Sequence, residues 1–224
     1  MTKAKVIRKD YESMSDFTYK VPVCISNGNR KIGRVMNVST MPIMACGNCK
    51  ECSGYCYDIK ACVQYKNVLD ARVRNLVYAT KYRKEYFDYI DNRISRRRTN
   101  KYFRWHVAGD ILDCDYFSRM VEIANRHPDF VFWTYTKMYH IVNEYVRING
   151  TGAIPDNFHI MFSKWDGLKM DNPYNFPVFA CRLKDGNKDY IPFNEYFKCA
   201  GNCDICKANN SGCIKGENTF ADEH

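Results

Sequence analysis

The grouping of the cysteines constrains this chain more than any other feature of its sequence. Eight of the twelve cysteines fall in two compact groups. They are Cys46, Cys49, Cys52 and Cys56, the first cysteine group, and Cys199, Cys203, Cys206 and Cys213, the second cysteine group. Thiols two or three residues apart can converge on one soft metal centre, because a tight loop lets the sulfurs point inward. The sequence therefore predicts that the chain holds metal and favours iron–sulfur.

Chain length and composition indicate where such thiols would be found. With 224 residues the chain can bury a sizeable core, so it does not need disulfides to fold. Its first residues are charged and lack the apolar segment of a secretory signal, and no run approaches the ~20 apolar residues of a membrane span. We expect a cytoplasmic protein without membrane contact. In a reducing compartment, grouped cysteines bind metal more often than they pair as a disulfide scaffold.

The number of ligands in the first cysteine group decides what a metal there could do. Three cysteines leave one metal corner open for a substrate or cofactor, whereas four close the site and suit electron transfer or structure. The spacing allows Cys49, Cys52 and Cys56, or Cys46 with the last two, or all four. The second group, C-x3-C-x2-C-x6-C, offers four thiols and accepts either an iron–sulfur cluster or zinc. We expect two [4Fe–4S] clusters, with zinc as the alternative metal.

The remaining pattern predicts an α/β fold. Strands and helices alternate after a β-hairpin, and units of this length imply parallel strands with right-handed crossovers. The expected strands are Phe17–Ile25 and Lys31–Ser39 (the hairpin), Lys101–Ala108, Phe130–Thr136, Phe158–Phe162 and Pro177–Arg182. The expected helices cover Asp58–Ile94, with a break near Thr80 or Tyr82, Cys114–Asn125 and Met138–Ile148.

One domain accounts for these elements. We predict a mobile lead-in over residues 1–16 and an open or partial (β/α) barrel of mostly parallel strands over 17–198, with the cysteine loop at 46–56. The cysteine-rich, cluster-binding tail over 199–224 is expected to pack on the same domain. In a barrel, active sites form where the strands end. That edge would carry Gly109 and Asp110, Lys137, and Ser163.

Several motifs together resemble the phage gene-product-88 family. They are the hairpin, the cysteine loop ending in Gly-Tyr-Cys-Tyr, the segments RWHVAGD, VFWTYTK and FSKW, and the cysteine-rich tail, which together span Lys31 to Cys213. A phage origin would imply the host cytoplasm. The family is in turn similar to radical S-adenosylmethionine (radical SAM) enzymes, which carry C-x3-C-x2-C. This chain departs from that pattern, because Cys49, Cys52 and Cys56 have the two gaps in reverse order.

The resemblance to radical SAM enzymes implies a possible S-adenosylmethionine site. In those enzymes a Gly-Gly-Glu segment after the second strand receives the methionyl amine, and Gly109-Asp110 is the nearest analogue here. Lys137 and Ser163, at the next two strand ends, would complete the cofactor site. Alternatives stay open, since Asp110 could be a turn residue and Lys137 a solvated lysine. His106 is expected to be a satisfied core histidine, and Cys24, Cys114 and Cys181 are expected to be small buried hydrophobes.

Positive charge suggests one further partner. The formal net charge is +9, and part of the excess lies in one short run, Arg93, Arg96, Arg97 and Arg98. Cations at the end of a helix complement its dipole, and we favour that interpretation over a phosphate-contacting patch for nucleic acid.

Three functions follow from these observations, and they leave open whether the chain is an enzyme. The first is an iron–sulfur protein with an electron-transfer or redox role and an unidentified redox partner or substrate. The second is a radical SAM-type enzyme that cleaves S-adenosylmethionine at the first cysteine group. The third is a zinc-stabilised nucleic-acid-binding module.

Overall fold

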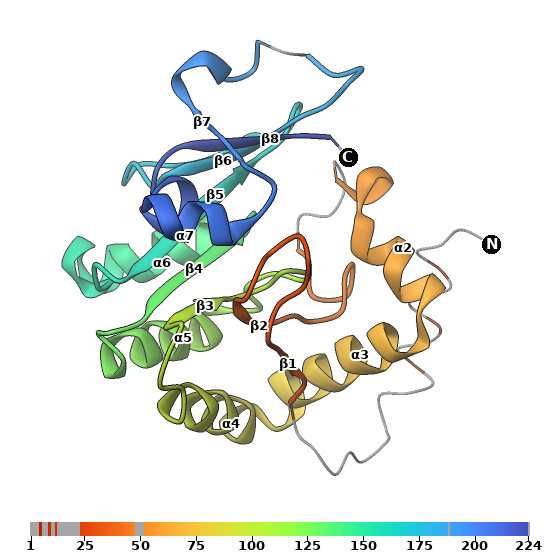
Figure 1. The fold of residues 1–224 in the computed structure, drawn as a ribbon, viewed down its shortest axis with the longest axis vertical. Coiled ribbons are helices and arrows are strands. Elements are labelled where there is room, and N and C mark those ends of the chain that lie inside the picture. Colours follow the sequence, from red (N-terminus) through yellow and green to blue (C-terminus); the bar gives the residue numbers. More distant parts are fainter. Residues whose placement is uncertain are drawn as a thin grey trace.

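The computed structural model describes residues 5, 9, 12, 23–47, 52–187 and 189–223. The predicted lead-in over 1–16, apart from three single positions, lies outside this set, as do the first part of the predicted strand Phe17–Ile25 and Cys49. The described chain is a mixed α/β structure built on one eight-stranded sheet (Figure 1). No helix in these described residues is both long and apolar enough to cross a membrane.

The sheet is mostly parallel. Its strands are β1 (Ile25–Ser26), β2 (Met36–Val38), β3 (Tyr102–Arg104), β4 (Val131–Thr136), β5 (Phe158–Lys164), β6 (Val178–Arg182), β7 (Phe197–Lys198) and β8 (Thr219–Asp222). They lie in the order β1-β2-β3-β4-β5-β6-β8-β7, and only β1 is antiparallel to its neighbour. Within the described residues no pairing joins β1 to β7, so the sheet is open. The predicted α/β class and parallel strands are confirmed, and curvature into a partial barrel stays a prediction.

The helices up to residue 149 follow the predicted pattern with one extra break, and the helix at Cys203–Asn209 was not predicted. The helices are α2 (Tyr57–Gln64), α3 (Lys66–Lys81), α4 (Arg83–Ser95), α5 (Cys114–Arg126), α6 (Tyr139–Asn149) and α7 (Cys203–Asn209). The predicted break at Tyr82 is confirmed, because its backbone leaves the helical conformation there (φ −132°, ψ 52°). A second break at Tyr65 was not predicted, since apolar periodicity continues on both sides of it.

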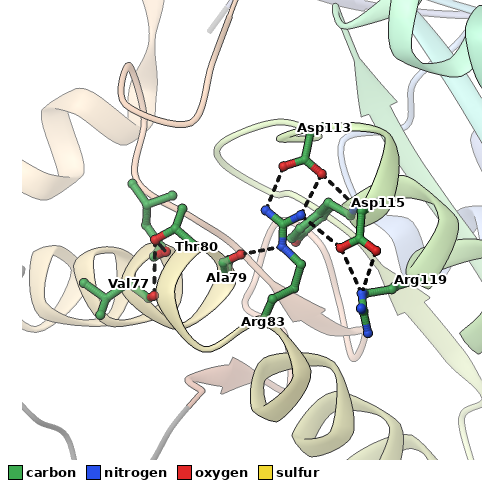
Figure 2. Close-up of polar contacts among 9 residues, drawn as sticks. Val77, Ala79, Thr80, Arg83, Asp113, Asp115 and Arg119 are labelled. Atoms are coloured by element: carbon green, nitrogen blue, oxygen red, sulfur yellow. Dashed lines mark hydrogen bonds and ion pairs between the residues drawn. The ribbon is translucent and has the colours of Figure 1, made fainter.

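Arg83 fixes the corner between α3 and α4 against the start of α5 (Figure 2). Its Nε donates to the Ala79 carbonyl (3.0 Å), and its two Nη atoms form a bidentate pair with the Asp113 carboxylate, both at 2.7 Å. Asp113 is also the N-cap of α5, accepting from the Tyr116 backbone N–H at 2.9 Å. The Asp113 carboxylate therefore holds the start of α4 and the start of α5 together.

The sheet buries both faces, but against different parts of the chain. The helix-covered face packs α4, α5 and α6 against residues such as Phe103, Phe132 and Phe162. The opposite, cysteine-covered face packs the second cysteine group against Trp133 and Met161. Alternate residues of β4 divide between the two faces, as the two-residue period of a strand requires.

The order of the parallel strands brings the candidate site residues to one edge of the sheet. Strands β2 to β6 are neighbours in the sheet in the order in which they occur in the chain, and each pair is parallel. Their carboxyl ends therefore meet at the same edge, the position where ligands bind in open parallel sheets. In Figure 1, β6 and β8 continue the sheet, and β8 leads to the C-terminus. The strands β7 and β8 were not predicted, because each is too short to show alternation.

Candidate metal centres

Cys46, Cys52 and Cys56, the described members of the first cysteine group, lie at the carboxyl edge of the sheet. The loop that carries them leaves β2, and a Cβ on Gly47 would approach the Met138 side chain, at the start of α6, to 2.6 Å. Tyr57 follows Cys56 in the chain, and its hydroxyl donates to the Val107 carbonyl beyond β3. The loop is thus attached to the ends of at least two strands.

The last cysteine of this group lies at a helix N-terminus. Cys56 is the N-cap residue of α2 and is half-buried. Burial raises the pKa of its thiol, whereas the N–H groups of Ile59 and Asp58 favour the thiolate. A helix N-terminus is a common setting for a metal-binding or reactive thiolate.

Lys137 lies directly beside the first cysteine group. Burial opposes the charge of its ammonium, but Cys52, Asp110 and Cys46 together raise the pKa of the amine. Its Nζ also lies 5.7 Å from the centre of the Trp165 ring. Lys137 is half-buried among these groups rather than fully solvated.

Cys181 also belongs to this neighbourhood, although the sequence suggested an isolated core residue. It is half-buried on β6, and Lys137 and Cys52 both act on its thiol. Burial raises the pKa of this thiol to about 11. Cys114 was also expected to be buried and is exposed, at the start of α5. Cys181 lies two residues after Phe179 on β6, and alternation along the strand puts both on the cysteine-covered face. Its distance in sequence from the two cysteine groups gave no such signal.

The second cysteine group forms the cover of the other sheet face. Cys206 lies on α7 and Cys213 on the following 3-10 turn (Gly212–Ile214), and each is only 8% exposed. Both pack with Trp133 and Met161, and the half-buried Cys203 lies against the same cluster. Cys199 is anchored by its backbone N–H, which donates to the Phe220 carbonyl on β8 (2.7 Å). Two of the four cysteines are therefore buried and two are half-buried, in one compact segment.

The thiols of this segment act on one another. Burial raises the pKa of Cys203, of Cys206 and of Cys213, and Cys199 raises each of them further. For Cys213 the value reaches about 12, although hydrogen bonds with the Tyr135 and Thr219 hydroxyls favour its thiolate. A bound metal ion would favour the thiolate over the thiol, because it binds the deprotonated sulfur.

Hydrogen-bond donors are also directed at these sulfurs. The backbone N–H of Gly201 donates to Cys199 Sγ at 3.4 Å. Gly201 and Gly212 have positive φ (73° and 63°), and a Cβ on Gly212 would meet the Phe197 ring at 2.9 Å, so both glycines allow the chain to fold back as expected. N–H···S contacts of this kind tune thiolate-bound metals.

The donor set fits a thiolate metal centre in kind. Buried and half-buried thiols, N–H donors and hydroxyl groups gather there, and the segment from Cys199 to Cys213 contains no histidine. In the part of the chain that the structure describes, however, no group of three or more His, Cys, Asp or Glu side chains is arranged to hold a metal ion. Cys49 lies outside that part. Metal binding at either group therefore stays a prediction.

The residues expected to hold S-adenosylmethionine have structural partners. Gly109 (φ +83°) approaches Thr40 so closely that a Cβ would lie 1.9 Å from Thr40 Oγ1. Asp110 is buried and accepts from the Ile111 N–H (2.8 Å), the Lys137 N–H (2.9 Å) and Thr136 Oγ1 (2.6 Å). These bonds support the alternative role of Asp110 as a turn residue. Ser163 is buried on β5, and its carbonyl accepts from the Tyr139 hydroxyl.

His106 is a buried histidine with two partners, as expected. Its Nε2 lies 3.0 Å from the Tyr116 hydroxyl, and its Nδ1 lies 3.3 Å from Thr134 Oγ1. Burial and the nearby Arg104 lower its pKa to about 3, so the ring is neutral. The histidine is therefore part of the core.

The candidate nucleic-acid contacts lie elsewhere. Arg93, Arg96 and Arg98 are exposed at the end of α4, and Arg97 donates from Nε to the Thr99 carbonyl at 3.1 Å. This helix end precedes β3, so it lies toward the amino ends of the parallel strands, away from the first cysteine group. Binding of nucleic acid by these arginines stays a prediction.

Comparisons with known proteins identify the family but not the activity. No curated protein and no solved structure matches the sequence. One family model, described as Gene product 88, matches residues 23–175. This match does not extend to radical SAM enzymes, and similarity to them stays a prediction. Because the model covers more than half of the 224 residues, the chain belongs to the phage gene product 88 family.

Proposed function

We propose that this chain is an iron–sulfur protein with an electron-transfer or redox role, holding one [4Fe–4S] cluster at each cysteine group. One observation carries the proposal: Cys203, Cys206 and Cys213 pack in one cluster on the sheet face, and Cys199 acts on all three of their thiols.

The surroundings of the second group favour a cluster over bare thiols. Such a cluster would supply one-electron chemistry at a potential set by burial and by hydrogen bonds to its sulfurs. Here Trp133 and Met161 keep water from the thiols, and the hydroxyls of Tyr135 and Thr219 favour the thiolate at Cys213. Zinc would accept the same four thiolates, so it remains the alternative metal.

The position of the first group supports a second candidate function, a radical SAM-type enzyme on a partial (β/α) barrel. Cys52 and Cys46 lie near Lys137 at the carboxyl edge of the sheet, the position of catalytic sites in such folds. Asp110 weighs against this function, because its two oxygens already accept three hydrogen bonds. Only one lone pair, on Oδ2, is left to accept from a cofactor amine. We therefore rank this function second.

Metal analysis tests the proposal. Protein purified without oxygen should contain about eight iron and eight sulfide per chain, because two [4Fe–4S] clusters require them. Cys213→Ser and Cys56→Ser should each lose about half of both. The exposed Cys114 is in neither group, so Cys114→Ser is the matched control and should keep the full content. Zinc in place of iron would refute the iron–sulfur proposal, and unchanged iron in Cys213→Ser would refute the second group as a ligand set.

Spectroscopy separates the two functions. If the first cluster has four cysteine ligands, the electron-paramagnetic signal of the reduced protein should not change when S-adenosylmethionine is added. A changed signal that disappears in Cys56→Ser but not in Cys213→Ser would favour the radical SAM-type enzyme.

A further inference from the structure

A half-buried arginine faces the second cysteine group from the sheet. Arg104 is the last residue of β3, and its cross-strand neighbours are Asn37 on β2 and Trp133 on β4. Its guanidinium carbon lies 4.5 Å from the centre of the Tyr135 ring, on the cysteine-covered face. The cation is thus directed toward the segment that carries Cys203 and Cys213.

This cation has no carboxylate partner within the described ranges of the chain. Its Nε atom is buried and makes no hydrogen bond there. Arg83 and Arg72, by contrast, form bidentate contacts with Asp113 and Asp58. A buried charge without a partner is costly, because the protein interior does not replace the water it loses.

The groups that do surround Arg104 become anions only when they lose a proton. Burial opposes the charge, but four nearby groups raise the pKa of the guanidinium: the phenols of Tyr135 and Tyr57 and the thiols of Cys203 and Cys213. Thiols that bind a metal are deprotonated, and four thiolates exceed the charge of a divalent metal ion or an oxidised [4Fe–4S] core by two. A metal centre at the second cysteine group would therefore supply the anion that Arg104 lacks.

We propose that Arg104 is the charge-compensating residue of the second cysteine group, neutralising the thiolates of Cys203 and Cys213 when they bind metal. This inference rests on the proposed function and names the residue that stabilises its buried site. A second observation supports it. The indole Nε1–H of Trp133, the cross-strand neighbour of Arg104, is also buried without a partner, in the cluster that contains Cys206 and Cys213. Arg104 and Trp133 thus both leave donors unused on the face that the sulfurs cover.

Binding of Co²⁺ and Zn²⁺ to reduced, metal-stripped protein tests this role. The measurement is a competition titration against a chelator, in a Cys56→Ser background so that binding reports the second group. Arg104→Gln should weaken the metal about 10–100-fold, the range for residues that support metal ligands. Arg104→Lys should retain most of the affinity. Arg147→Gln is the matched control, because Arg147 is exposed and pairs with Glu144 on its own helix, and it should bind as the parent does.

Thermal unfolding of the metal-stripped proteins separates charge compensation from packing. Removing an uncompensated buried charge should leave Arg104→Gln at least as stable as its parent without metal, while its metal affinity falls. A loss of both stability and affinity would mean that Arg104 acts by packing and would overturn the inference, as would unchanged affinity. If the parent binds neither metal at the second group, the proposed function fails there too.

Discussion

Asp110 accepts a 2.6 Å hydrogen bond from Thr136 Oγ1, so a buried carboxylate joins the segment after β3 to the end of β4. The same carboxylate accepts from the Lys137 backbone N–H. Lys137 is thereby fixed at the edge where its side chain meets Cys52. The edge of the sheet that presents the first cysteine group is therefore held by hydrogen bonds to one side chain.

Replacing this carboxylate should destabilise the protein. Asp110→Asn exchanges an acceptor oxygen for an N–H₂ group that faces N–H donors, and we expect a loss of about 1–3 kcal/mol in the free energy of unfolding, measured with urea. Asp129→Asn is the control, since Asp129 is an exposed partner of Lys101 and such pairs contribute about 0–1 kcal/mol. Unchanged stability of Asp110→Asn would instead favour a role for Asp110 in ligand binding.

Gly109 should tolerate no side chain. At φ +83°, a Cβ would be strained, and it would lie 1.9 Å from Thr40 Oγ1. We expect Gly109→Ala to lower the free energy of unfolding by more than about 1 kcal/mol, the usual cost of the backbone strain alone. The control is Gly152→Ala, because Gly152 has open space and no positive φ. Equal stability of the two variants would contradict the close approach of Gly109 to Thr40.

The sequence predicted the middle of the fold well, for physical reasons. The elements from α5 to β5 match within two residues, because strong apolar periodicity is interrupted by residues that end helices, Pro128 after α5 and Gly150 after α6. The break at Tyr65 and the two-residue strand β7 left no such signal. Contacts with distant parts of the chain, rather than local sequence, determine the break at Tyr65 and the position of β7.

The candidate site was predicted only in part. The close spacing of the cysteines in the sequence identified both groups. The alternation of strands and helices identified the strand ends that lie near the first group. Spacing could not show that the second group covers the sheet face opposite the helices. Arg104 and Cys181 were missed for the same reason: alternation gives the face on which a strand residue lies, but not the segment that covers it.

His106 should make stability depend on pH. Its pKa is about 3 in the folded protein, against an ordinary value of 6.5, so below pH 6.5 the unfolded chain binds a proton that the folded protein does not. Its stabilising contribution is therefore full above pH 6.5 and is lost progressively as the pH falls toward 3. His106→Gln should show a flatter decline than the parent in urea unfolding between pH 6.5 and 4. Parallel curves would mean that His106 is protonated in the fold.

The arginines after α4 should contribute little to nucleic-acid binding. Because Arg96 and Arg98 are exposed at a helix C-terminus, their charges complement the helix dipole, an effect of about 0.3–1 kcal/mol each. We expect a variant with Arg96, Arg97 and Arg98 changed to Gln to bind single- and double-stranded DNA as the parent does. If these arginines contact phosphates, affinity should fall and the slope of log K against log salt should decrease by about 0.9 per contact on duplex DNA.

Lys137 should control the reactivity of the first cysteine group. Its buried ammonium interacts with Cys52, and a nearby cation increases the thiolate fraction of a cysteine. In reduced, metal-stripped protein, Lys137→Met should slow the alkylation of Cys52 by iodoacetamide about threefold to tenfold, followed by mass spectrometry of the peptide. The exposed Cys114 is the internal reference, and Lys66→Gln, which removes a lysine that is 82% exposed, is the control. An unchanged rate at Cys52 would show that the ammonium does not stabilise this thiolate.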